Sequence, residues 1–170
     1  MKISILLPYK ENYSPSYAGA VSIFINDVTK ESIYNKDITI YGSTNFTKKL
    51  SKNYINIPLE KKFLISQSKT YVKKFIDIQK NFKVDILEVH NRPIYIKDLL
   101  VIKTNLVLYF HNDPISMIGS RSVNERLFLL DKCKIINFNS EWSKKQFLTD
   151  LPNIYVKSDK LKVIHQSTKK

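Results

Sequence analysis

Two short apolar runs, each followed at once by a polar corner, stand out between Asn105 and Trp142. The runs span residues 106–110 and 135–138, and the pattern between them predicts a helix over about 121–133. The polar corners are His111-Asn112-Asp113-Pro114 and Asn139-Ser140-Glu141. Strand, loop, helix and strand in this order are typical of an open parallel α/β sheet, in which ligands bind at the carboxyl ends of the strands.

The rest of the chain repeats this alternation. Apolar runs predict strands over 2–7, 38–41, 54–57, 85–90, 106–110, 135–138 and 160–164. Helical spacing joins Val21, Phe24, Ile25, Val28 and Ile33 in one segment, and Leu64, Ser68, Tyr71, Val72, Phe75, Gln79 and Phe82 in another. Pro93 suits the first turn of a further helix. We therefore predict a three-layer α/β/α domain, with a mainly parallel sheet of about seven strands in which 3–7 and 106–110 are central.

Composition limits the classes of protein. A chain of 170 residues, 43% of them hydrophobic, fits one domain with a full core. No apolar run approaches the length that spans a bilayer, and the N-terminal run meets Pro8 too early for a signal peptide, so a cytoplasmic location is expected. The single cysteine, Cys133, excludes an internal disulfide and is expected to be an inert core thiol.

The net charge of +13 suggests an anionic partner. However, only three of the 28 basic residues are arginine, and the lysines are scattered. A lysine-coated, solvated surface is therefore favoured over a specific polyanion site. Attraction to an anionic membrane surface is left open, because charge acts without a motif.

The three histidines each follow a predicted strand and are expected at one edge of the sheet. They are His90, His111 and His165, and the three arginines Arg92, Arg121 and Arg126 lie within or just after two of the same loops. Any one histidine could simply cap a strand or fill the core. Taken together, the six side chains favour a functional edge.

Gly19 lies where the first loop becomes the first helix. A missing Cβ there allows close approach of a ligand, and the free amides of a helix start favour an anion. A glycine that only eases packing is an equal alternative. No metal-ligand spacing, P-loop or nucleophile elbow is present in the sequence.

His90-Asn91-Arg92-Pro93 places an imidazole, an amide and a guanidinium together at one strand end. Such groups recognise carboxylates, phosphates and sugar hydroxyls. The alternative is a surface arginine before a proline-started helix. The same arrangement recurs at His111-Asn112-Asp113-Pro114, although Asp113-Pro114 could be only a turn.

These motifs resemble the N-terminal domain of a GT-B glycosyltransferase of the family 4-like group, the bacterial kind that builds lipopolysaccharide and other surface glycans. The resemblance covers nearly the whole chain. It rests on Ala18-Gly19-Ala20, on Glu88-Val89-His90-Asn91-Arg92-Pro93, and on His111-Asn112-Asp113-Pro114 with Met117, Gly119-Ser120, Glu125-Arg126 and Asn139-Ser140-Glu141-Trp142. It implies a Rossmann-like domain over 1–166, a linker beginning at 167–170, and a missing second domain that binds the nucleotide-sugar.

The resemblance also implies roles for single residues. Gly19 and Ala20 would contact the donor diphosphate, with Ala18 standing where a second glycine is frequent, and His111 would be the catalytic residue beside the donor sugar. The acceptor side or cleft would be formed by His90, Asn91, Arg92, Asn112, Asp113, Arg121, Ser140 and Glu141.

The implied activity is retaining transfer of a sugar from a nucleotide-sugar to a glycan or lipid-linked acceptor, without metal or other cofactor. The implied location is cytoplasmic, in peripheral contact with the inner face of the membrane. The alternative function is a non-catalytic basic α/β module that binds nucleic acid or an anionic membrane.

Overall fold

A single sheet of seven parallel strands forms the centre of the computed structural model, which describes residues 1–59 and 66–166. The strands are β1 (Ile3–Leu6), β2 (Ile38–Gly42), β3 (Tyr54–Asn56), β4 (Ile86–His90), β5 (Asn105–Phe110), β6 (Ile135–Phe138) and β7 (Leu161–Val163). Their order in space is β3-β2-β1-β4-β5-β6-β7. The predicted parallel sheet is confirmed, with β1 and β5 on either side of the central β4.

The direction of strand addition reverses between β1 and β4. From β1 the chain builds outward through β2 and β3, then returns to β4 and builds the other way. Neighbouring loops diverge at such a point and leave a crevice at the carboxyl ends of the strands. The fold therefore favours a ligand site beside the ends of β1, β4 and β5.

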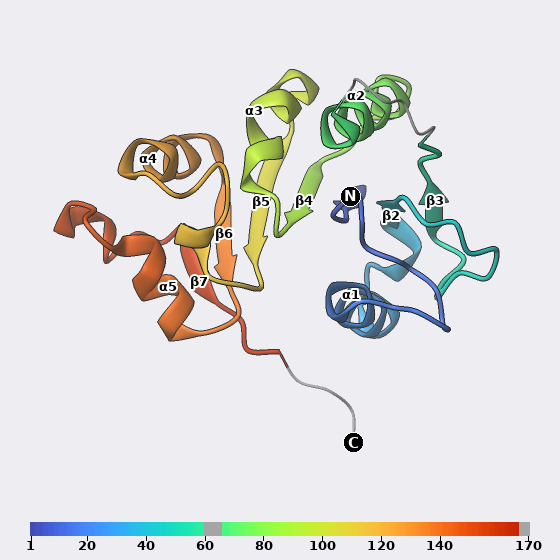
Figure 1. Cartoon of the computed structure of the whole chain (residues 1–170), viewed down its shortest axis with the longest axis horizontal. Coiled ribbons are helices and arrows are strands. Elements are labelled where there is room, and N and C mark those ends of the chain that lie inside the picture. The colour runs from blue at the N-terminus through green and yellow to red at the C-terminus, as the bar shows by residue number, and fades with distance from the viewer. Residues whose placement is uncertain (60–65, 167–170) are drawn as a thin grey trace.

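Helices connect the strands and cover the sheet. They are α1 (Ala20–Glu31), α2 (Gln67–Gln79), α3 (Ile96–Leu99), α4 (Val123–Lys132) and α5 (Glu141–Leu148). Figure 1 shows α1 on the opposite side of the sheet from α2 and α3. The helix expected after Pro93 is broken into 3-10 turns at 93–95 and 100–102 around the short α3.

The apolar residues form two buried clusters. The smaller one lies under α1 and contains Ile5, Leu7, Tyr13, Val21, Ile25, Ile38 and Ile40. The larger one joins the other face to the remaining helices and includes three packed rings, those of Phe110, Phe138 and Phe147, with centroids 5.3–5.7 Å apart. Cys133 is buried in the larger cluster, and burial raises the pKa of its thiol to about 12, as expected of an inert core cysteine.

Three apolar side chains that helical spacing assigned to the core are exposed. Ile33 lies beyond the end of α1 and is 90% exposed, and Phe82 lies beyond the end of α2 and is 61% exposed. Val28 is within α1 and also faces outward. For Ile33 and Phe82 the reason is that the apolar spacing continues beyond the helix ends, where it no longer predicts a buried face. The expectation for Leu64 and that for the linker at 167–170 lie outside the described residues.

None of the helices within residues 1–59 and 66–166 combines the length and the apolar character that crossing a bilayer requires.

Candidate active site

The ends of β4 and β5 bring two histidines into direct contact. His90 is the last residue of β4 and pairs with Tyr109 of β5, and His111 follows directly after the end of β5. The Nδ1 atom of His90 lies 2.7 Å from Nε2 of His111. The side chain of His90 is completely buried and that of His111 is partly buried.

A carboxylate on the same strand completes this group. Glu88 lies two residues before His90, so both side chains point to the same face of β4. Its Oε1 atom lies 2.6 Å from Nε2 of His90. Glu88 belongs to the motif that ends at Pro93 but was not among the expected site residues, although strand alternation predicts its place beside His90.

Two aromatic rings enclose the histidines. The ring of Tyr109 stacks on that of His111 at 4.5 Å, and Phe24 of α1 meets His111 edge-on at 5.4 Å. The hydroxyl of Tyr109 donates to the carbonyl of Ile164 at 2.7 Å. Burial, and then the charge of Glu88, raise the pKa of Tyr109 to about 12, so this hydroxyl keeps its proton.

His111 is held at the start of its loop and is uncharged at neutral pH. Its backbone N–H donates to Oδ1 of Asn91 at 3.1 Å, and its carbonyl accepts from Nδ2 of Asn139 at 2.7 Å. Burial, followed by repulsion from the neighbouring imidazole of His90, lowers its pKa to about 3. Gln166 approaches from the segment after β7, and its Nε2 contacts Nδ1 of His111.

Asn91 therefore links the ends of β4 and β5 through its hydrogen bonds. It is buried and adopts a left-handed backbone conformation with φ of 54°, which asparagine tolerates better than most residues. Its N–H donates to the carbonyl of Tyr109 at 2.8 Å. The side chain of Asn91 was expected to face an acceptor, but it accepts a hydrogen bond from the backbone of His111 instead.

The other residues expected on the acceptor side are spread along the same edge. Arg92 donates to the carbonyl of Asn91 at 2.8 Å, and Asn112 is exposed. The carboxylate of Asp113 accepts from the N–H of Ile115 at 3.2 Å, so Asp113 and Pro114 form the turn that is the alternative to a ligand contact. Arg121 is exposed and donates to the carbonyl of Ser116.

Ser140 and Glu141 lie at the start of α5. Ser140 is the N-cap residue, and its hydroxyl accepts from the N–H of Ser143 at 3.2 Å. This bond satisfies one of the amides that a helix start leaves free. Glu141 is exposed in the first turn, where a negative charge suits the helix dipole.

The start of α1 holds a carboxylate from the chain itself. Oε1 of Glu11 accepts from the N–H of Ser22 at 3.0 Å, in the first turn of the helix. A Cβ atom at Gly19 would lie 2.1 Å from the same oxygen. The close approach that the missing Cβ of Gly19 allows is thus made by Glu11. No local motif marks Glu11 as a partner of a helix that begins nine residues later, so the sequence did not reveal this contact.

The prediction that all three arginines gather at this edge is wrong for Arg126. Its side chain is buried and donates to the carbonyls of Ser120, Arg121 and Thr149. It therefore ties the start of α4 to the end of α5 and does not face a ligand. His165 follows β7 at the predicted edge but is exposed. The structure brings two histidines into contact, and the third borders the neighbouring hollow that Phe24, Glu88 and Tyr109 line.

The hollows of the molecule lie around this edge and at the opposite one. One hollow of about 400 Å³ is lined by Pro93, Ile94, Lys97, Gly119 and the start of α4, beside the proposed acceptor loops. Another of about 310 Å³ borders Phe24, Glu88 and Tyr109. The largest, of about 560 Å³, lies between the residues that precede β4 and β5, and so at the amino ends of these strands.

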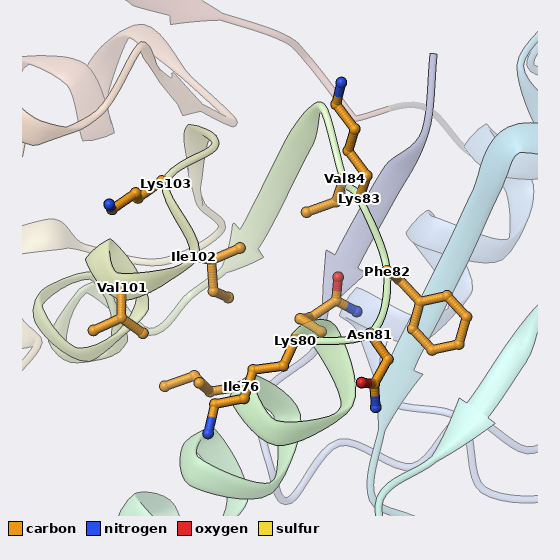
Figure 2. Close-up of a pocket in the computed structure, with 10 residues that line it drawn as sticks. Ile76, Lys80, Asn81, Phe82, Lys83, Val84, Val101, Ile102 and Lys103 are labelled. Carbon is orange, nitrogen blue, oxygen red and sulfur yellow. The ribbon is translucent and has the colours of Figure 1, made fainter.

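Figure 2 shows the largest hollow, where the lysines at 80, 83 and 103 extend in different directions. Lys80 is already paired with Asp77 at 2.7 Å. Since the hydrogen-bonded histidines and the topological switch both lie at the other edge, we place the candidate site there, not at the largest hollow. The described residues contain no group of three or more His, Cys, Asp or Glu side chains that could hold a metal ion.

Comparison with known proteins finds likeness of fold among solved structures only. Searches against protein-family models and against curated proteins give no match. Among solved structures, the chain is similar to Anabaena Alr3699/HepE in complex with UDP, with a TM-score of 0.64, 15% identity, and coverage of 99% of this chain and 44% of that chain. The same Anabaena protein also has a structure in complex with UDP-glucose.

Two further neighbours come from other bacteria. UDP-N-acetylglucosamine 2-epimerase from Rickettsia bellii has a TM-score of 0.62 and 11% identity, and covers 98% of this chain and 45% of that chain. Acinetobacter baumannii MurG has a TM-score of 0.54 and 8% identity, and covers 100% of this chain and 46% of that chain. The likeness establishes the fold. It is the Rossmann-like half of a GT-B fold, and the chain spans less than half the length of each of these proteins.

Proposed function

We propose that this chain is the acceptor-side domain of a glycosyltransferase that transfers a sugar from a nucleotide-sugar donor, with retention of anomeric configuration, to a glycan or lipid-linked acceptor of surface polysaccharide or lipopolysaccharide. The observation that carries the proposal is the contact between His90 and His111 at 2.7 Å. This contact lies at the carboxyl ends of β4 and β5, beside the reversal in strand order where α/β sheets bind ligands.

The fold neighbours support a nucleotide-sugar as the ligand class. The Anabaena protein is in complex with UDP or UDP-glucose, and the Rickettsia protein is a UDP-N-acetylglucosamine 2-epimerase. In the proposal, the nucleotide is held by a second GT-B domain, supplied in cis or in trans, and the two domains face each other across the edge that carries His111.

Individual roles follow from position along this edge. His111 lies beside the donor sugar as a neutral imidazole, and the amides near Gly19 and Ala20 contact the diphosphate once Glu11 has moved aside. The acceptor is contacted by Arg92, Asn112, Asp113 and Arg121, while Ser140 and Glu141 border the cleft. His90, which was expected on the acceptor side, is completely buried and contacts His111 instead. Amides and cationic side chains stabilise the leaving diphosphate, so the reaction needs no metal.

The apolar hollow of about 400 Å³ supports a lipid-linked acceptor. Pro93, Ile94 and Phe128 line it, and Lys97 lies at its side. An acyl or prenyl chain would bury apolar surface there, and the lysine would suit a phosphate at its head. We propose accordingly that the protein works at the cytoplasmic face of a membrane as a peripheral enzyme.

The test is an activity assay with the second domain supplied. The chain is combined with that domain, fused or separate, and incubated with a panel of nucleotide-sugars and lipid-linked or glycan acceptors. Sugar transfer is expected, and His111→Asn lowers kcat by at least about a hundredfold, whereas His165→Asn stays within about twofold of the unaltered enzyme. Epimerisation of the donor without transfer, or full activity of the His111 variant, would refute the proposal.

A further inference from the structure

Glu88, His90, His111 and Gln166 form one continuous chain of hydrogen bonds. Its separations are 2.6 Å between Glu88 Oε1 and His90 Nε2, and 2.7 Å between His90 Nδ1 and His111 Nε2. The last link joins His111 Nδ1 to the amide nitrogen of Gln166. Every ring nitrogen of both histidines is therefore used, and the chain runs from the buried strand β4 to the exposed tail.

The chemistry of the two ends fixes where the protons lie. An ionised carboxylate only accepts, so Nε2 of His90 carries a proton and donates it to Glu88. With its one proton on Nε2, the His90 ring accepts at Nδ1, and this requires a proton on Nε2 of His111. The amide nitrogen of Gln166 is a donor, and this matches an unprotonated Nδ1 on His111.

The opposite arrangement of protons leaves two donors facing each other. A proton on Nδ1 of His111 would point at the amide hydrogens of Gln166. A second proton on His111 is also disfavoured, because burial and the neighbouring His90 lower the pKa of this ring to about 3. The hydrogen-bond partners of His111 and its lowered pKa thus both favour the neutral ring with its proton on Nε2.

The surroundings keep the His111 ring from turning over. Tyr109 stacks on one face of the ring and Phe24 meets it edge-on. Its backbone is held on both sides by Asn91 and Asn139. A ring flip would put carbon atoms in the places of Nε2 and Nδ1 and break the hydrogen bonds to His90 and Gln166.

We propose that Glu88 and His90 are positioning residues that hold His111 in the Nε2–H tautomer, so that its Nδ1 offers a lone pair to a hydroxyl of the sugar substrate. The amide of Gln166 occupies the place that this hydroxyl takes. The sugar as ligand rests on the function proposed above, whereas the tautomer does not. Glu88 acts through His90 and does not touch the substrate.

Imidazole nitrogen resonances test the tautomer on this chain directly. Two-bond proton–nitrogen correlation spectra at neutral pH are expected to show His111 with its proton on Nε2. In Glu88→Gln the carboxamide can donate as well as accept, so a measurable fraction of the Nδ1–H form of His111 appears. Glu88→Asp keeps the acceptor and retains the Nε2–H form if the shorter side chain still reaches His90, and the exposed His165→Gln variant leaves the His111 signals unchanged.

An Nδ1–H tautomer of His111 in the unaltered protein would overturn the proposal, and this result does not depend on any variant folding. An unchanged tautomer in a folded Glu88→Gln variant would equally remove the role of Glu88.

The transfer assay separates the two proposals. Glu88→Gln is expected to lower kcat roughly ten- to a hundredfold, the effect of weakening one hydrogen bond to a charged group, with KM for the donor within about twofold. Unchanged kcat would refute the catalytic benefit of the positioning. Absence of sugar transfer by the unaltered enzyme would refute the proposed function and leave the tautomer measurement standing.

Discussion

His111 couples the candidate site to the stability of the fold. Its pKa of about 3 in the folded protein lies below the ordinary value of 6.5. The unfolded chain therefore binds a proton as pH falls through 6.5 while the folded chain does not, so the stability that this group confers is present above pH 6.5 and is lost towards pH 3.

We expect unfolding free energy to fall by roughly 2 kcal/mol from this group alone between pH 6.5 and pH 4.5. Urea unfolding of the unaltered protein and of His111→Gln at both pH values checks this. The variant should lose less stability on acidification than the unaltered protein, and His165→Gln should behave like the unaltered protein. An equal loss in the His111 variant would show that the imidazole is not buried in its neutral form.

In the proposed function, Glu11 competes with the donor diphosphate for the start of α1. Its carboxylate lies at the amide of Ser22 and against Gly19, where a diphosphate would bind. Removing the charge in Glu11→Gln should strengthen the binding of UDP to the two-domain protein by roughly three- to tenfold, because the helix dipole then faces no internal anion. Glu11→Asp, which keeps the charge, is the control in calorimetric titrations. Weaker binding by Glu11→Gln would instead assign the carboxylate to ligand binding.

At the scale of elements, Arg126 joins α4 to the end of α5. It is 2% exposed and donates to three carbonyl oxygens, those of residues 120, 121 and 149. Replacing it with glutamine leaves buried carbonyls without donors, which costs about 2–4 kcal/mol. Arg121→Gln, in the exposed arginine of the same loop, should cost less than about 1 kcal/mol. The denaturant midpoints of the two variants measure this difference in stability loss. Equal midpoints would contradict the structural role of Arg126.

The strands could be read from the sequence, whereas the contacts of the site could not. Continuous apolar runs predict buried parallel strands because both faces of each strand are covered, and all seven were found within about two residues of their predicted bounds. The exposure of Ile33 and Phe82 was missed because periodicity does not show where a helix ends. The contacts of Glu11 with α1 and of Gln166 with His111 join residues distant in the chain, and only the folded topology brings them together.

For the whole molecule, the charge of +13 leads to a prediction about polyanions. Of its three arginines, Arg126 is buried, and the lysines carry no fixed bidentate geometry. Binding to DNA, RNA or anionic vesicles should therefore be weak and should disappear at about 0.2 M salt. Fluorescence anisotropy and vesicle sedimentation across a salt series check this. Tight binding that persists at that salt concentration would favour the alternative of a polyanion-binding module.

The interior place of β1 has a consequence for how the protein is made. Among the seven described strands β1 is synthesised before the others, yet it pairs with β2 on one side and with β4 on the other. Until the residues of β4 leave the ribosome, one side of β1 presents backbone N–H and C=O groups without their final partners. During translation, β1 therefore passes through a stage in which the edge that later pairs with β4 is unpaired. A chaperone would protect the nascent protein most at this stage.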